Sequence, residues 1–157
     1  MDAEYKHLMM GMIFIKYLSD NFVSQQERVL KMVSNPKSEY YLGNVPRDIK
    51  EAIEDRDYYI MNNCFWIPSN CRWEFLEEVS NNEFLGKFLD EAIISITQEN
   101  KVLMGKFNTR FEFSHFEKTK LQEIFKIVRN IKFEIDQNFN CTSTSLIKIY
   151  ERILLEF

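Results

Sequence analysis

The scarcity of turn-forming residues is the feature that most restricts how this chain can fold. Its 157 residues include four Gly and three Pro, and neither Asn-Gly nor Asp-Gly occurs. A β-protein of this length would need several tight hairpins, which depend on such pairs. The length also suits one domain with a sizeable core. The sequence therefore predicts an all-α fold in a single domain over residues 1–157.

Apolar residues recur at helical spacing, which predicts a bundle of about five or more helices. The clearest pattern covers 83–99, where Phe84, Phe88 and Ile93 share an apolar stripe and Asp90 lies on the opposite face. We expect Phe88 and Ile93 to be buried and the acidic residues to form a solvated surface. The other predicted helices cover residues 2–22, 48–53, 69–79, 117–131 and 142–157.

The first of these helices is apolar on nearly every side, which is typical of a central helix. Asp2 is its expected N-cap, and a polar continuation from Ser24 ends at Asn35-Pro36. Asp48 and Ser69 are the expected caps of the two short helices that follow.

Residues 36–68 are predicted to form an irregular aromatic insert. The segment Phe65-Trp66-Ile67-Pro68, followed by Arg72-Trp73, has two tryptophans close to a proline. Such rings bury a large area, which favours a structural plug. Recognition of a partner by an exposed Trp is the alternative.

We found no sequence motif for catalysis, cofactor binding or metal binding. Amino-group DNA methyltransferases use an Asp/Asn-Pro-Pro-Tyr/Phe loop. The segment Asn35-Pro36-Lys37-Ser38 lacks the second Pro and the aromatic residue of that loop, so we interpret it as a helix terminator. His7 and His115 have no metal-ligand spacing with the three cysteines. No apolar run is long enough to span a membrane, and the odd number of cysteines favours the cytoplasm.

The net charge of −4 is unevenly distributed. Residues 1–100 hold 10 Lys/Arg and 17 Asp/Glu, whereas residues 101–132 hold 8 and 3. The basic segment could face DNA or an acidic partner, or it could merely keep that face soluble. Its candidate residues are Lys101, Lys106, Arg110, Lys118, Lys126 and Arg129. Phenylalanines interleave with them and are expected in the core.

Four blocks of the sequence resemble, in order, the N-terminal helical domain of the modification (M) subunit of type I restriction-modification DNA methyltransferases. They are the opening 2–20, the aromatic blocks 57–73, the stretch 85–105 and the later helices at 121–124 and 150–154. The residues that carry this likeness, and for which we expect structural roles, are Tyr5, Lys6, His7, Phe65, Trp66, Pro68, Arg72, Trp73, Gly86 and Lys87.

The resemblance implies a full-length enzyme that methylates adenine N6 in DNA with S-adenosylmethionine. It implies a specificity subunit and a second M subunit as partners, with DNA bound by the assembled complex and a restriction subunit as a further candidate partner. Residues 143–157 would then form the helix that leads into the catalytic domain, and this chain itself would supply no catalytic residue and no cofactor site. The alternative is a freestanding helical adaptor, or a truncated remnant, that never acts with a catalytic domain.

Overall fold

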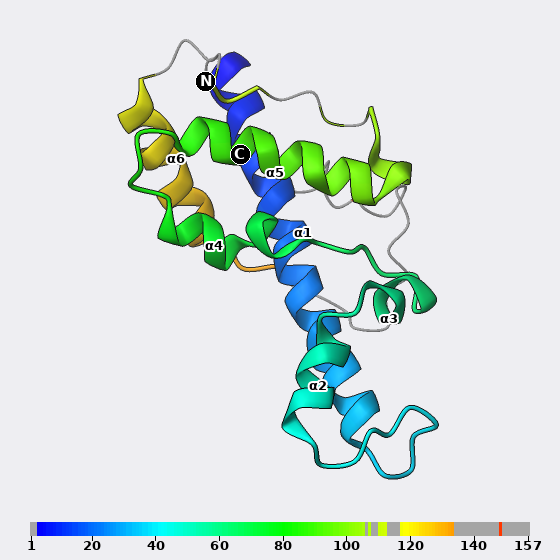
Figure 1. The fold of residues 1–157 in the computed structure, drawn as a ribbon. Helices are drawn as coiled ribbons and strands as arrows, with labels where there is room; N and C mark the ends of the chain where they lie inside the picture. The colour runs from blue at the N-terminus through cyan, green and yellow to red at the C-terminus, as the bar shows by residue number, and fades with distance from the viewer. Residues whose placement is uncertain (1–2, 106, 108–109, 113–116, 134–147, 149–157) are drawn as a thin grey trace.

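The described part of the chain consists of helices and their connections. The computed structural model describes residues 3–105, 107, 110–112, 117–133 and 148, and no strand occurs in these ranges. This confirms the predicted all-α bundle of at least five helices (Figure 1). The elements are α1 Ala3–Ser34, α2 Pro46–Ile53, α3 Arg56–Met61, the 3-10 turn η1 Ser69–Cys71, α4 Trp73–Glu78, α5 Leu85–Glu99, the 3-10 turn η2 Lys101–Leu103 and α6 Lys118–Arg129.

The long helix α1 is the centre of the fold. Every residue from Gly11 to Ser19 is buried, so this stretch has no face left for solvent. α1 contacts each of the other five α-helices, and in Figure 1 it runs through the molecule with α5 crossing it. It ends at Ser34, directly before Asn35-Pro36, as the sequence predicts. The expected cap, Asp2, lies outside the described residues.

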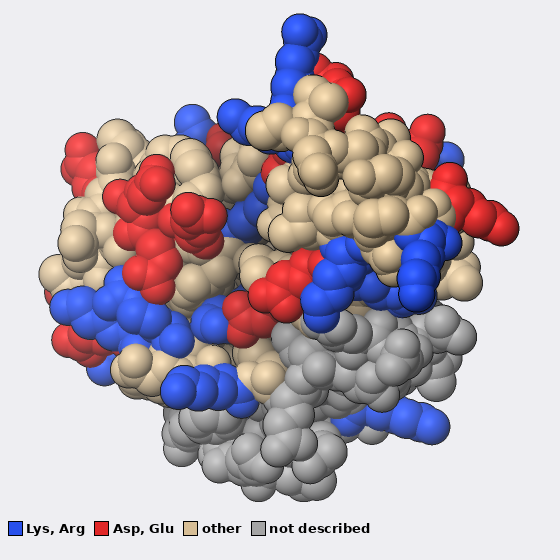
Figure 2. All heavy atoms as spheres, turned by 90° about the horizontal axis from the view of Figure 1, so that it is seen from below, with Lys and Arg blue, Asp and Glu red and all other residues tan. Residues whose placement is uncertain are grey.

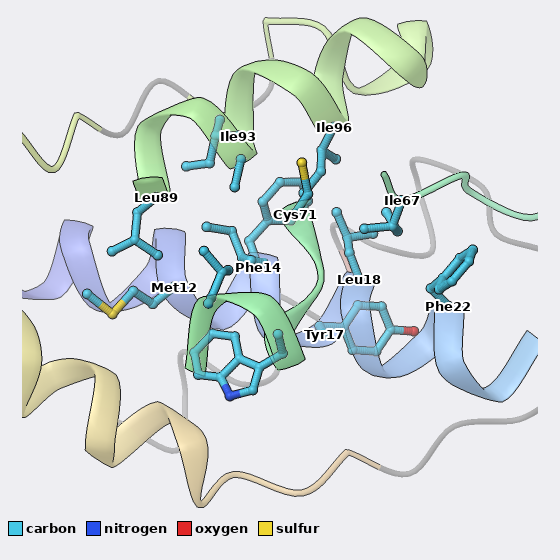
Figure 3. Close-up of a cluster of buried hydrophobic side chains, with 14 of the residues drawn as sticks. Met12, Phe14, Tyr17, Leu18, Phe22, Ile67, Cys71, Leu89, Ile93 and Ile96 are labelled. Atoms are coloured by element: carbon cyan, nitrogen blue, oxygen red, sulfur yellow. The ribbon is translucent and has the colours of Figure 1, made fainter. Parts of the chain in front are cut away.

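α5 packs its apolar stripe against α1. Leu89, Ile93 and Ile96 point toward α1 in Figure 3, and all three are buried. Phe14 and Leu18 of α1 face them, and both are at most 1% exposed. The burial predicted for Ile93 is therefore confirmed.

Four predictions about α5 are wrong. The helix begins at Leu85 and not at residue 83. Phe84 precedes the helix and is 54% exposed. Phe88 is only partly buried, with its ring edge-on to Phe75 of α4. Asp90 is buried rather than solvated, because another segment of the chain crosses the helix at that point.

Within the insert at 36–68, α2 confirms the short helix predicted at 48–53, and α3 is a further helix that was not predicted. Val45, not Asp48, is the N-cap of α2, and Pro46 occupies the first turn. Proline suits that position because its φ is already helical and its missing N–H would have no partner there. Asp48 instead lies in the first turn, where a carboxylate is favoured by the helix dipole.

The prediction for Ser69 is also wrong. Ser69 begins η1, and Arg72 is the N-cap of α4. The predicted helix at 117–131 is confirmed as α6, with Glu117 as its N-cap. The helix predicted at 142–157 lies outside the described ranges.

None of the helices within the described residues combines the length and the apolar character needed to cross a membrane.

Two adjacent isoleucines of α5 provide a matched test of this packing. Ile93→Ala should lower the free energy of unfolding by about 2–5 kcal/mol, because it removes apolar contact and leaves a cavity next to α1. Ile94 is 41% exposed, so Ile94→Ala should cost less than about 1 kcal/mol. Urea unfolding measures both values, and equal losses would contradict the assigned face of α5.

Candidate interaction surface

The aromatic insert is anchored on α1 by ring packing. The rings of Tyr59 and Phe22 stack with their centroids 4.7 Å apart, and Trp66 meets Phe22 edge-on at 5.5 Å. The Tyr59 hydroxyl donates to the Ile53 carbonyl at 2.5 Å, and burial raises the pKa of this hydroxyl. Phe65 is buried and Trp66 partly buried, so these rings belong to the core and its edge.

Asn100 fixes the backbone of this segment from the end of α5. Its side-chain oxygen accepts from the Trp66 N–H at 3.0 Å, and its amide nitrogen donates to the Trp66 carbonyl at 2.8 Å. A second bond from that nitrogen reaches the Ile96 carbonyl, also at 2.8 Å. One buried amide thus satisfies both backbone groups of Trp66, a residue that belongs to no helix or strand. Pro68 follows and is the residue before η1.

Arg72 joins the insert to α1 and to the end of α2. Its Nη1 and Nη2 atoms each lie 2.9 Å from a carboxylate oxygen of Glu54, and its Nε donates to the Ile67 carbonyl at 3.0 Å. The guanidinium also lies over the Phe22 ring, 4.2 Å from its centroid. The Arg72 side chain is 13% exposed and the Glu54 side chain 44%, so only the arginine of this two-bonded pair is shielded from water.

Trp73 connects α4 to both α1 and α6. Its backbone N–H donates to Ser19 Oγ of α1 at 2.7 Å. Its ring stacks on Phe125 of α6 with centroids 4.2 Å apart and planes 3° apart. Its indole Nε1 donates to Glu77 at 3.0 Å, and the same carboxylate oxygen accepts from Arg129 Nε at 2.8 Å.

Gly86 and Asp90 receive the segment that precedes α6. A Cβ atom on Gly86 would lie 3.2 Å from the backbone N and Cα of Glu112, so this close approach favours glycine. The Asp90 carboxylate accepts from the N–H groups of Phe111, at 2.7 Å, and Glu112, at 3.1 Å. Burial raises the pKa of Asp90, although these two bonds oppose the shift. Lys87, the neighbour of Gly86, is exposed.

The start of α1 is less enclosed. Tyr5 is partly buried and packs against the core, with Lys120 Nζ 5.7 Å from its ring centroid. Lys6 and His7 are both exposed. The residues that carry the family likeness therefore include core, edge and surface positions.

The structure places the basic candidates on the surface, and it pairs two of them with carboxylates. Lys118 Nζ lies 3.6 Å from Glu83, and Arg129 pairs with Glu77. Figure 2 shows a face on which Lys and Arg lie beside Asp and Glu. The further candidates Lys101, Arg110 and Lys126 are exposed, and Lys106 lies outside the described residues. Among the interleaved phenylalanines, Phe111 is buried, and Phe107 stacks on Phe14 with centroids 3.4 Å apart.

Two further cations join Arg129 beside α1, and one of them, Lys16, lies outside the basic segment 101–132 that sequence analysis selected. Lys16 of α1 and Lys132, just after α6, line the same surface hollow as Arg129, together with Asp20. Lys16 was detectable as the one charge within the apolar core of the first helix. Its proximity to the end of α6 depends on helix packing, which the sequence does not reveal.

The described residues contain no group of three or more His, Cys, Asp or Glu side chains that could hold a metal ion. Cys64 and Cys71 are buried, and burial raises the pKa of the Cys71 thiol to about 11. A thiol with so high a pKa is protonated at neutral pH, so it is a poor nucleophile.

These observations define an all-helical domain whose charged and aromatic groups mostly fix its own packing and whose remaining basic groups lie on its surface. Residues 1–131 match the family model described as the HsdM N-terminal domain. The chain belongs to this family, as the sequence resemblance indicates.

One relative extends the comparison. Over 90 residues the chain is 30% identical to the type I restriction enzyme MjaIX methylase subunit of Methanocaldococcus jannaschii. The aligned region is 57% of this chain but 16% of that protein. The similarity therefore concerns a small part of the relative's length.

Arg72 gives a direct test of the anchoring described above. Arg72→Lys should lower the free energy of unfolding by about 2 kcal/mol, because lysine can neither bond both Glu54 oxygens nor stack flat on Phe22. The control is Arg47→Lys, since Arg47 forms an exposed pair with Glu51 and should change stability by less than about 0.5 kcal/mol. Denaturant unfolding distinguishes the two, and equal effects would contradict the anchoring role.

Proposed function

We propose that this chain is the assembly and DNA-clamping domain of a type I modification methyltransferase subunit. The observation that carries this proposal is the family membership over residues 1–131. The name of the M. jannaschii relative, a methylase subunit of a type I restriction enzyme, points the same way. The full-length protein would transfer a methyl group from S-adenosylmethionine to adenine N6, using a catalytic domain outside this chain.

The way the domain uses its polar groups supports a role in assembly. Arg72, Asn100 and Asp90, which could serve chemistry elsewhere, all bond the chain's own backbone here. Contacts with other molecules would therefore involve side chains on the surface. That surface includes exposed basic side chains and exposed apolar ones, such as Ile60 and Val102, of the kind that subunit interfaces bury.

The proposed partners follow from the family. A specificity subunit would read the DNA sequence, a second copy of the modification subunit would complete the enzyme, and a restriction subunit could join them. The domain would contact DNA within this complex, because its net charge of −4 disfavours strong DNA binding by the isolated chain. A substrate of cellular DNA also implies a cytoplasmic location.

Deleting the domain from the full-length subunit tests this proposal. Without residues 1–131, the subunit should still bind S-adenosylmethionine with unchanged affinity, because the cofactor site lies in another domain. It should lose stable association with the specificity subunit and, in consequence, tight binding to duplex DNA. Size-exclusion chromatography and fluorescence anisotropy measure the two losses.

Calorimetry with this chain alone supplies the control, and no saturable binding of S-adenosylmethionine is expected. A deleted subunit that still assembles and binds DNA like the intact one would contradict the proposed role. A reading frame with no glycine-rich cofactor loop and no Asn-Pro-Pro-aromatic motif after residue 157 would instead favour the freestanding adaptor or remnant.

A further inference from the structure

A surface hollow between α1 and the end of α6 gathers positive charge. It has a volume of about 500 Å³, and its charged lining consists of Lys16, Arg129, Lys132 and Asp20. Three cations therefore face one carboxylate. These residues come from positions more than one hundred apart in the sequence and meet because α6 packs against α1.

The single carboxylate does not cancel this charge. Asp20 forms an ion pair with Lys16, one turn before it on the same helix. Arg129 pairs with Glu77 through Nε, but its planar guanidinium carries further N–H donors. Lys132 is exposed. After the Lys16–Asp20 and Arg129–Glu77 pairs are counted, Lys132 leaves one net positive charge, and Arg129 keeps further N–H donors.

Lys16, one of the lining residues, is fixed by the packing around it. Lys16 is 9% exposed, and its ammonium lies 5.8 Å from the Trp73 ring centroid and 5.9 Å from that of Phe133. A cation fixed in such an environment needs little rearrangement to attract an anion. The low local dielectric also strengthens that attraction compared with a lysine fully in water.

We propose that this hollow binds one backbone phosphate of duplex DNA, with Arg129 and Lys132 in contact and Lys16 adding charge from below. The proposal rests on the proposed function and specifies where the domain would touch DNA. The planar guanidinium of Arg129 has N–H groups whose spacing matches that of two phosphate oxygens. Lys126 lies one turn before Arg129 on α6 and is also exposed, so a further cation of this helix could meet the same phosphate backbone.

This contact would position the domain without reading sequence. Arg129 and Lys132 would contact a phosphate and not a base edge, and phosphate contacts carry no sequence information directly. The same binding energy is therefore expected on the recognition site and on unrelated DNA.

The test measures DNA affinity of the assembled methyltransferase at several salt concentrations. In the double variant Arg129→Gln/Lys132→Gln, the slope of log affinity against log salt should become shallower by about one unit, the value for one phosphate. The loss should be equal on cognate and unrelated duplexes. The single variant Lys132→Gln changes an exposed side chain, so it should shift the slope in the same direction without endangering the fold.

The matched control is Arg47→Gln/Lys50→Gln on α2, which removes the same residue types from an exposed helix at the other end of α1. Its slope should equal that of the unchanged enzyme. If the unchanged enzyme binds DNA and the hollow variants keep its slope, the phosphate site is refuted while the proposed function stands. Loss of the specificity subunit with an unchanged slope would also refute it and make the hollow a protein interface. An unchanged enzyme that neither assembles nor binds DNA would refute both proposals.

Discussion

A helix with no solvent-facing side over its central turns is the constraint on which the rest of this structure depends. From Gly11 to Ser19 every residue of α1 is buried, so water must be excluded from its whole circumference. One neighbouring helix could cover only part of it. The chain therefore places α4, α5 and α6 around this stretch and α2 and α3 farther along, and α1 contacts all five.

Two of the residues that carry the family likeness, Arg72 and Trp73, follow from the same constraint. Short elements such as α3, η1 and α4 bury too little area to be stable alone, so they need specific bonds to α1 and its neighbours. Arg72 on Glu54 and Phe22, and Trp73 on Ser19 and Phe125, supply them. Charged and aromatic side chains whose sequence pattern could indicate a binding site thus stabilise the packing of the domain itself.

The sequence revealed those elements whose pattern is local. The helices α1, α5 and α6 could be predicted because their apolar spacing repeats over several turns, and the end of α1 because proline marks it. The environment of Asp90 could not be predicted from the sequence, because its partners are the backbone N–H groups of residues 111 and 112, which are distant in the sequence. The hollow was missed for a similar reason. Lys16 and Lys132 are ordinary lysines until helix packing brings them together.

Hydrogen exchange tests the central position of α1 most directly. Because the core cannot open around α1 without losing every helix contact, the amides of Ile13, Phe14 and Ile15 should exchange only through global unfolding. Their free energy of opening should equal the free energy of unfolding measured with denaturant, and the amides of α2 should open at lower cost. If these three amides opened at a lower free energy than those of α5, then α5 would be stable without α1, and the account would be wrong.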